Sequence, residues 1–432
     1  MSTILSRRAP RIEYDSYGEP IVRPPIGSSE LDEPAFGLLF DIDGVLGRGA
    51  NPFPNAQEAF KLLCDPEGKE LRVPVAFVTN ACGNGPAKVQ RLSEWFNLEI
   101  DPDQLIQAPS PLTVFKEYHR KRALFVGQEN TLEIAHELGF MNAVSIEDVK
   151  AAYPLLDMVD HANRRRLLKV TPVPRALDRI ELIVLLGEPT RWETHLQLLV
   201  DLLMTNGDPD QVPVSIPEEH IPVIACNMDL VYMDQAVLPR FGHGAFLACL
   251  QALYRQFTGQ KLKYTSLLGK PSEISLRFAE HTLTLMSKRM GYTRSIDRIY
   301  FFGDNPDVDV LGANLYNNFL RRFRHLSGGD KHGNDEHAQH QRVSVAQSRT
   351  VPPQADLLPQ TARGIDAILV QTGVYSPNVK LQNRANYCHR DFQGATDLVL
   401  PTFEVKDCLE GIQMVLQLQN FHPSVRADKV EP

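Results

Sequence analysis

The segment 36–49, FGLLFDIDGVLGRG, constrains the fold of this chain more than any other. Its short apolar run is typical of a buried parallel strand, and the glycines after it predict a tight loop. Asp41 and Asp43 are therefore expected at the carboxyl end of a strand, where open α/β sheets bind ligands. Two carboxylates so close to a core are costly unless a cation or a reaction needs them. The segment predicts a chemical site.

Strand-like and helix-like segments alternate along the 432 residues, which predicts an α/β fold with a parallel sheet. The segments 145–178 and 205–221 are rich in proline and charge and are expected to link parts of a middle region. The expected strands are 36–40, 73–79, 122–126, 180–186, 222–225, 298–302 and 365–371. The expected helices are 55–64, 86–96, 130–138, 192–204, 243–257, 272–290 and 406–418.

Composition excludes some classes of protein. A net charge of −8 without a basic stripe argues against nucleic-acid binding. The six cysteines are scattered without zinc spacing, as in a reduced intracellular protein. No apolar run reaches the roughly 18–20 residues of a membrane span, so no integral membrane segment is expected.

Two segments are expected to lie outside the packed core. Residues 1–12 lack acids and carry three arginines, so residues 1–34 form either a mitochondrial targeting segment or a flexible arm. The polar, proline-interrupted stretch 321–363 is expected to be a flexible insertion. Its irregular spacing favours a solvated loop over a metal site for its histidines, which are His325, His332, His337 and His340.

Three further segments complement the aspartate pair. The strand 73–79 ends in Thr79 and Asn80, whose side chains can donate hydrogen bonds to a phosphate oxygen. Lys270 lies in a Gly-Lys-Pro-Ser turn before a helix, where its ammonium could hold a phosphoryl oxygen. The run 303–309, GDNPDVD, again places acids after a buried strand.

Together these segments predict a phosphoryl-transfer site. Carboxylate oxygens from two strand ends suit Mg2+, whose coordination shell a substrate phosphate and water would complete. One aspartate could attack phosphorus and the other could move the proton of the leaving oxygen. The lysine, the threonine and Mg2+ could stabilise charge on the transferring group.

The order DxDG, Thr-Asn, GKP and GDNPDVD resembles that of the haloacid dehalogenase (HAD) superfamily, mostly Mg2+-dependent phosphatases. The resemblance implies a Rossmann-like doubly wound parallel sheet with an inserted α/β cap domain. It is similar to the subgroup of NagD-type and pyridoxal-phosphate phosphatases, whose large cap lies between the threonine and lysine motifs. The domains so implied are a core of 35–84 and 266–420, a cap of 85–265 and a tail of 421–432.

The resemblance also implies a role for each motif residue. Asp41 would be the nucleophile, Asp43 the general acid/base, Thr79 the phosphoryl-oxygen ligand and Lys270 the stabilising lysine. Since haloacid dehalogenases and transport ATPases lack the second aspartate, phosphate-ester hydrolysis is the expected reaction.

The expected Mg2+ ligands are Asp41, Asp304 and the backbone carbonyl of Asp43, with Asp309 supporting them. Asp307 fits the family spacing less well than Asp309. Contacts with the substrate are expected from Gly44, Asn80 and Asn305.

Smaller similarities sharpen the expectation. The segments 226–229 (CNMD) and 371–374 (QTGV) resemble the NagD-like subgroup. The runs 155–160, 187–194 and 239–244 resemble a narrower group of HAD-like hydrolases, which implies a mitochondrial location, with the cytoplasm as the alternative. A homodimer through the cap is a further expectation of the resemblance.

Gly47 departs from the subgroup, which carries a bulky residue there, and this predicts a more flexible loop facing the cap. The substrate is expected to be a small phosphorylated metabolite that the sequence does not identify. Two other functions stay open: a catalytically weak binding or regulatory protein, and phosphoryl transfer to an acceptor other than water.

Overall fold

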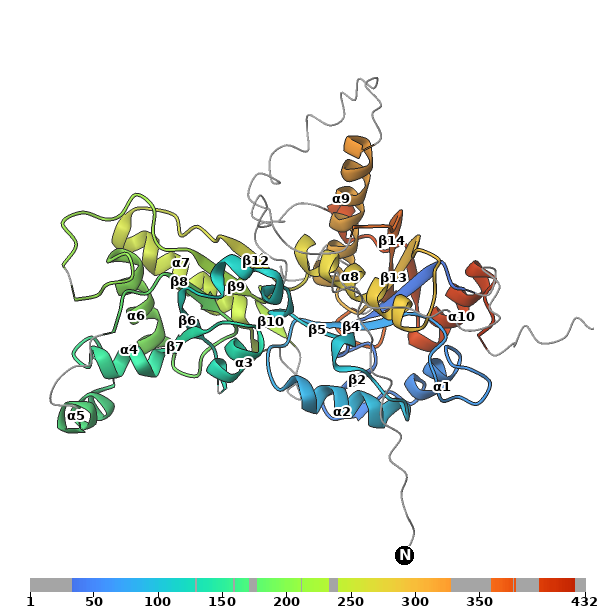
Figure 1. The fold of residues 1–432 in the computed structure, drawn as a ribbon, viewed down its shortest axis with the longest axis horizontal. Helices are drawn as coiled ribbons and strands as arrows, with labels where there is room; N and C mark the ends of the chain where they lie inside the picture. Colours follow the sequence, from blue (N-terminus) through green and yellow to red (C-terminus); the bar gives the residue numbers. More distant parts are fainter. Residues whose placement is uncertain are drawn as a thin grey trace, which may run out of the picture.

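The computed structural model describes residues 33–423 except 129, 158–159, 171–176, 211, 233–239, 328–358, 376 and 378–395. Two parallel sheets, each flanked by helices, make up two neighbouring lobes (Figure 1). No described helix is both long and apolar enough to cross a bilayer.

The first sheet has six parallel strands in the order β15-β14-β13-β1-β4-β5. The strand order reverses at β1, which lies between β13 and β4, and such a reversal opens a crevice at the carboxyl ends of the strands. The strands are β1 (Phe36–Phe40), β4 (Val75–Thr79), β5 (Leu105–Gln107), β13 (Arg298–Gly303), β14 (Gly364–Val370) and β15 (Phe403–Val405).

Both faces of this sheet are buried because its strands are apolar throughout rather than alternating. In β1, Phe36, Leu38 and Phe40 join one core cluster, while Leu39 joins the cluster on the opposite face. One face is covered by α1 (Ala56–Lys61), α2 (Gly85–Phe96) and α10 (Cys408–Gln419). The other is covered by α8 (Glu273–Arg289) and α9 (Leu311–Ser327). The sheet is therefore doubly wound, as predicted.

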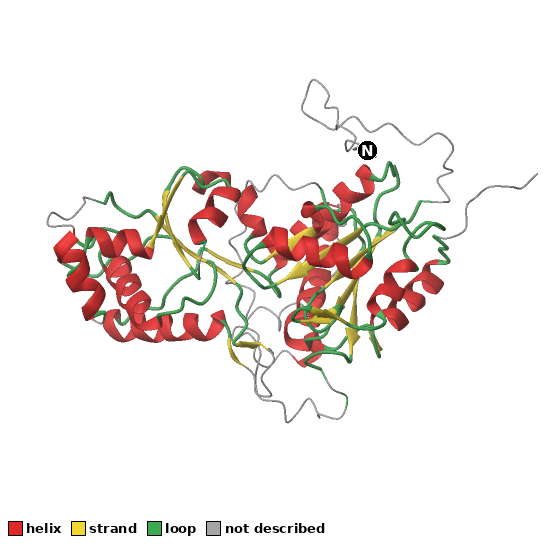
Figure 2. Cartoon of the chain, turned by 90° about the horizontal axis from the view of Figure 1, so that it is seen from below, coloured by secondary structure: helices red, strands yellow, loops and turns green. Residues whose placement is uncertain are grey.

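The second sheet, in the inserted lobe, has five parallel strands in the order β12-β9-β8-β6-β7. Figure 2 shows helices around this sheet as well. Its strands are β6 (Arg122–Val126), β7 (Asn142–Ser145), β8 (Leu182–Leu185), β9 (Val223–Cys226) and β12 (Ser266–Leu268). Its helices are α3 (Thr131–Glu137), α4 (Ile146–Ala152), α5 (His161–Val170), α6 (Trp192–Met204) and α7 (His243–Thr258).

All seven predicted strands and all seven predicted helices are present, with boundaries shifted by a few residues. The predicted linker 145–178 contains α4 and α5, whose polar composition concealed them. The predicted insertion 321–363 begins later than expected because α9 continues to Ser327, while 328–358 lie outside the described residues. Helix α9 was not among the predicted helices, and its amphipathic pattern is the signal that could have identified it.

Two short strands do not pair as the predicted cap boundaries imply. β5 lies within the predicted cap range 85–265, yet it pairs with β4 in the core sheet, and α2 packs on the same core. β12 lies just beyond that range, yet it pairs with β9 in the cap sheet. Short strands of three residues carry little periodicity, so the sequence did not reveal which sheet each would join.

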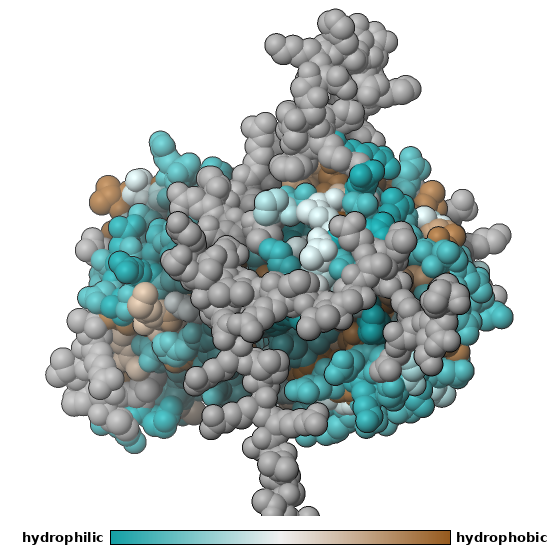
Figure 3. Space-filling view, turned by 45° about the vertical axis from the view of Figure 1, so that its right-hand side comes forward, coloured by the Kyte–Doolittle hydropathy of each residue, from teal (hydrophilic) through white to brown (hydrophobic). Residues whose placement is uncertain are grey.

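The described surface in Figure 3 is mostly hydrophilic, with apolar residues in separate patches. Several of the most exposed large apolar side chains belong to the cap lobe, among them Leu155, Val212, Phe241 and Phe257. The five cysteines that the structure describes are all unbridged, as predicted for a reduced protein. Cys388 and most of the N-terminal arm lie outside the described residues.

Candidate active site

The loop after β1 separates the two aspartates into different environments. The Asp41 backbone N–H donates to the Phe302 carbonyl (2.8 Å) on neighbouring β13, and the residue is only 8% exposed. Asp43 is exposed, and its backbone bridges to Gly47. The strand therefore ends at Asp41, and the chain turns so that one carboxylate faces the interior and the other faces solvent.

The ammonium of Lys270 lies between two carboxylates, one after β1 and one after β13. Its Nζ lies 2.7 Å from Asp41 Oδ1 and 2.8 Å from Asp309 Oδ1, and the residue is 3% exposed. Burial opposes a charged ammonium, but Asp309 and Asp41 outweigh it and hold the pKa of Lys270 above its usual range. The lysine is thus a fixed cation between two carboxylates.

Asp304 and Asp309 follow β13. Asp309 Oδ2 accepts hydrogen bonds from the backbone N–H groups of Asp304 (3.1 Å) and Asn305 (3.0 Å). Asp304 Oδ2 accepts one from the Val374 N–H (2.6 Å). Asp309 therefore has both oxygens engaged, one by backbone amides and one by Lys270, which is the arrangement of a supporting group.

Three buried carboxylates meet here, and Lys270 is paired with two of them. Asp41, Asp304 and Asp309 each offer an oxygen within 4.8 Å of the others. Burial, together with the charge of Asp309, raises the pKa of Asp304 to about 7 and that of Asp41 well above its usual range. Hard oxygen ligands in such a cluster fit a divalent cation such as Mg2+, which would favour their ionised forms.

Two glycines allow the loops to close around Asp304. Gly44 has φ +90°, and a Cβ there would lie 2.3 Å from Asp304 Oδ2. A Cβ at Gly373 would lie 1.8 Å from the same oxygen. Thr372 Oγ1 donates to the Gly44 carbonyl (2.6 Å) and fixes one loop on the other. Gly373 and Thr372 were noted in the sequence only as part of a subgroup-like run, without this role.

Thr79 is the last residue of β4 and Asn80 follows it; both residues are buried. Thr79 Oγ1 accepts a hydrogen bond from the Ala81 N–H (3.1 Å), which leaves its hydroxyl proton to donate elsewhere. Asn80 Oδ1 accepts from the Lys270 N–H (2.6 Å), and its Nδ2 donates to the Lys270 carbonyl (3.0 Å). Asn80 is thus bonded to both the N–H and the carbonyl of Lys270, and its contact with a substrate stays a prediction.

Asn305 has a comparable internal role. Its side chain caps the turn Pro306–Val310 by accepting from the Asp307 N–H (3.0 Å). Its position next to Asp304 keeps it near the crevice, and contact with a substrate stays a prediction. Asp307 is 2% exposed but is not a member of the carboxylate cluster found among the described residues.

The loop that contains Gly47 forms a hairpin that packs closely against its neighbours. The strands β2 (Gly47–Arg48) and β3 (Asn51–Pro52) form a small hairpin. A Cβ at Gly47 would lie 2.5 Å from the Asn51 carbonyl oxygen and 2.6 Å from the Trp95 ring. The interpretation of Gly47 as a source of flexibility was wrong, because glycine is required here by close packing against α2.

Lys88 is a cation near the site that the sequence analysis did not single out. It lies on α2 one turn before Arg91, whose guanidinium donates to the Gly49 carbonyl (3.1 Å) of the hairpin. Burial lowers the pKa of Lys88, whereas the charges of Asp43 and then Asp41 raise it. Only the folded helix reveals that this lysine faces the aspartate pair, because 45 residues of chain separate it from Asp43.

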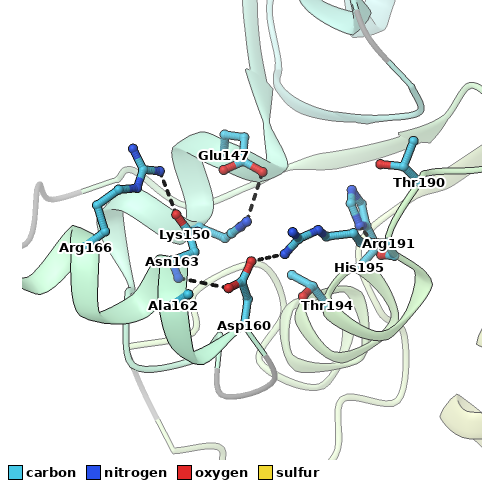
Figure 4. A pocket seen from close by; sticks show the side chains of 10 residues that line it. All are labelled: Glu147, Lys150, Asp160, Ala162, Asn163, Arg166, Thr190, Arg191, Thr194 and His195. Carbon is cyan, nitrogen blue, oxygen red and sulfur yellow. Dashed lines mark hydrogen bonds and ion pairs between the residues drawn. The ribbon is translucent and has the colours of Figure 1, made fainter.

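A separate pocket lies in the cap, away from the carboxylates (Figure 4). It has a volume of about 480 Å³ and lies between α4, α5 and α6. Two of its cations are ion-paired within the protein, Lys150 with Glu147 (3.0 Å) and Arg191 with Asp160, and Arg166 donates to Asn163 Oδ1 (2.6 Å). The pocket contains none of the predicted site residues, and its charges are largely neutralised.

Comparison with known proteins shows what this chain is similar to. The family described as haloacid dehalogenase-like hydrolase matches residues 38–141. The chain is 27% identical over 285 residues to the cardiolipin synthase (CMP-forming) / mitochondrial hydrolase fusion protein of Schizosaccharomyces pombe, covering 65% of this chain and 46% of that protein. It is 26% identical over 308 residues to mitochondrial hydrolase YKR070W of Saccharomyces cerevisiae, covering 65% of this chain and 84% of that protein.

The chain thus spans about half the length of the fusion protein. Among solved structures, the p-nitrophenyl phosphatase from Archaeoglobus fulgidus is similar with a TM-score of 0.49 and 17% identity, covering 88% of this chain and 99% of that one. The family match over residues 38–141 confirms the predicted resemblance to the haloacid dehalogenase-like hydrolases.

Proposed function

We propose that this chain, similar to the haloacid dehalogenase-like hydrolases, is a Mg2+-dependent phosphatase that acts on a small phosphorylated metabolite. The observation that carries the proposal is the position of the Lys270 ammonium, 2.7 Å from Asp41 and 2.8 Å from Asp309. Asp304 lies in the same carboxylate cluster. A nucleophile, a fixed cation and a cation-binding cluster are the groups that phosphoryl transfer requires.

In the proposed first step, the Asp41 carboxylate attacks phosphorus, and the bond from phosphorus to the ester oxygen breaks. Asp43 gives its proton to that oxygen. Water then attacks the aspartyl-phosphate, Asp43 takes a proton from the water, and the bond between phosphorus and Asp41 breaks. The exposure of Asp43 supports this role, because a proton shuttle must reach the leaving group and the water.

The remaining residues stabilise charge. Lys270 and the Thr79 hydroxyl would bind oxygens of the transferring group, and Asp309 would orient Lys270. Asp41, Asp304 and the backbone carbonyl of Asp43 would hold Mg2+, with Asp309 supporting them. When bound, Mg2+ would neutralise phosphate charge and favour the ionised nucleophile.

The test is hydrolysis of p-nitrophenyl phosphate with and without Mg2+ by the wild type and by Asp41→Asn. We expect Mg2+-dependent hydrolysis by the wild type and a loss of at least about 10³-fold in kcat for the variant. Glu137→Gln, on the exposed side of α3, is a matched control that should leave kcat unchanged.

If the wild type hydrolyses neither this ester nor any member of a metabolite-phosphate panel, the binding or regulatory alternative is favoured. Phosphoryl transfer to another acceptor would appear as a phosphorylated product that depends on added alcohol. The convergence of Asp41, Asp304, Asp309 and Lys270 supports the hydrolase over the weak binding protein.

A mitochondrial location is part of the proposal. Two yeast relatives carry the word mitochondrial in their names, and the arginines of residues 1–12 are compatible with targeting. A fluorescent fusion of the full chain should colocalise with mitochondria, and replacement of Arg7, Arg8 and Arg11 by alanine should abolish that. A cytoplasmic signal from the unaltered chain would favour the alternative.

A homodimer through the cap is also a proposal. It is supported by the exposed apolar side chains of that lobe, including Leu155, Phe241 and Phe257. Sedimentation velocity should give a dimer that Phe241→Ser weakens; a monomer at all concentrations would contradict the proposal.

A further inference from the structure

The orientation of the Asn80 amide is fixed by its neighbours. Its Oδ1 must face the Lys270 N–H (2.6 Å), because only an oxygen can accept that hydrogen bond. Its Nδ2 therefore faces the Lys270 carbonyl (3.0 Å) and the carboxylate of Asp229, at 3.2 Å from Oδ1 and 3.0 Å from Oδ2. One side chain thus connects a core strand, the peptide of Lys270 and a residue of the cap lobe.

The cap holds Asp229 firmly. The residue follows β9, and its backbone N–H donates to Asn227 Oδ1 (2.9 Å). Its carbonyl accepts from the Gly244 N–H (2.9 Å). A Cβ at Gly242 would lie 2.4 Å from the Asp229 carbonyl oxygen, and a Cβ at Gly244 would lie 2.4 Å from the Met228 carbonyl oxygen. The two glycines of the run 239–244 therefore allow the start of α7 to pack against this loop.

The contacts continue from Asp229 to the reacting groups. Asn80 binds both the N–H and the carbonyl of Lys270, and the ammonium of the same lysine bridges Asp41 and Asp309. Gly269, with φ +86°, leaves space for this approach, since a Cβ there would lie 2.9 Å from Asn80 Oδ1. A displacement of the Lys270 peptide would therefore move its ammonium relative to the nucleophile.

We propose that Asp229 is a positioning residue of the cap, which sets the place of Lys270 through Asn80. The proposal rests on the function proposed above and adds a route by which the cap lobe acts on the core site. Asp229 contacts Asn80 rather than the reacting atoms, so its effect is on the geometry of a charged group. Errors of about 1 Å in such geometry cost on the order of 10²-fold in rate.

Substitution of Asp229 removes the acceptor for the amide. Asp229→Ala leaves an Nδ2 hydrogen of Asn80 without its partner, whereas Asp229→Asn keeps an acceptor oxygen of the same shape. Burial raises the pKa of Asp229 to about 6, and the bond from Asn80 lowers it. Asp229→Asn therefore separates the loss of the negative charge from the loss of the acceptor oxygen.

The experiment measures kcat and KM for p-nitrophenyl phosphate with Mg2+ in four variants: Asp229→Ala, Asp229→Asn, Asn80→Ala and the double Asp229→Ala/Asn80→Ala. We expect Asp229→Ala to lower kcat about 10–100-fold with KM within about threefold. Asp229→Asn should recover most of kcat. The double variant should be no worse than Asn80→Ala, since both substitutions break one pathway. Glu137→Ala is the surface control.

A second measurement does not require turnover. Hydrogen exchange of the peptide with Lys270 should be faster in Asp229→Ala than in the wild type, because its N–H donates to Asn80. Unchanged exchange, additive losses in the double variant, or a loss confined to KM would each overturn the positioning role. If exchange changes as expected but the wild type hydrolyses no phosphate, the failure belongs to the proposed function instead.

Discussion

At the scale of single residues, the site depends on the two ion pairs that the Lys270 ammonium makes. Three carboxylates of the crevice, Asp41, Asp304 and Asp309, are each at most 8% exposed, and Lys270 pairs with two of them. Removing one partner of a buried ion pair costs about 3–5 kcal/mol, because the other charge stays buried. The lysine therefore belongs to the stability of the crevice as well as to its chemistry.

Lys88 is a second cation near the nucleophile. Burial lowers its pKa, whereas the charges of Asp43 and Asp41 are among those that raise it, so its ammonium is close enough to both carboxylates to interact with a bound anion. Lys88→Met should raise KM for anionic phosphate esters about 10-fold and change kcat less, since it removes binding common to substrate and transition state. Lys69→Met, at an exposed position, is the matched control. Equal values for wild type and Lys88→Met would show that the lysine does not bind substrate.

At the scale of elements, the hairpin β2–β3 and helix α2 form one wall of the site. Gly47 lies against Trp95, and Arg91 binds the carbonyl of Gly49. The hairpin carries Asp43 at its base, through the bridge to Gly47. The position of the proposed acid/base therefore depends on this packing.

The variant Gly47→Leu tests the packing of the hairpin against α2. The side chain would displace Trp95 or the Asn51 carbonyl, and overpacking of this kind costs about 1–3 kcal/mol. We expect a lower melting temperature in calorimetry and a lower kcat. Gly49→Asn is the control, because Asn tolerates φ +60° and no described atom lies within 4 Å of a Cβ there. A fully active and stable Gly47→Leu would contradict the packing argument.

Helix α7 begins with His243, which is fully buried. Burial lowers its pKa from the ordinary 6.5 to about 3. The folded state then binds fewer protons than the unfolded state between pH 6.5 and 3, so stability is lost as the pH falls through that window. His243 changes the free energy of unfolding by at most about 1.4 kcal/mol per pH unit.

Replacing His243 by Phe removes that titration while keeping an aromatic ring against Phe246. Urea unfolding at pH 7, 6, 5 and 4 should show a shallower loss of stability in His243→Phe than in the wild type. The difference in slope, rather than absolute stability, is the readout, so an overall offset does not matter. Parallel curves would mean that His243 does not titrate on unfolding.

At the scale of the whole molecule, we expect Mg2+ binding in the crevice to raise the free energy of unfolding. Repulsion between the carboxylates is offset in part by Lys270, and a divalent cation would relieve the rest. Saturation with Mg2+ at about 100-fold over Kd should add about 2.7 kcal/mol to the free energy of unfolding. Differential scanning fluorimetry should show a rise in melting temperature that Asp304→Asn reduces. No shift in the wild type would argue against a Mg2+ site.

Much of this protein could be predicted because its signals are local. The apolar runs of β1, β4 and β13 and the residues after them follow from strand periodicity and residue chemistry within a few positions. Asp41, Lys270 and Asp304 were therefore identified as site residues, and the structure brings them together with Asp309.

The rest depended on contacts between distant segments. The Asn80 side chain binds Lys270 and Asp229, which lie 190 and 149 residues away, and the sequence alone did not reveal either bond. The same holds for Gly47 against Trp95 and for Lys88 near Asp43. By itself the sequence determined which chemical groups stand at the strand ends, because periodicity is local. Tertiary structure decided which of those groups are engaged by the protein itself, because hydrogen-bond partners and packing depend on segments that meet only when the chain folds.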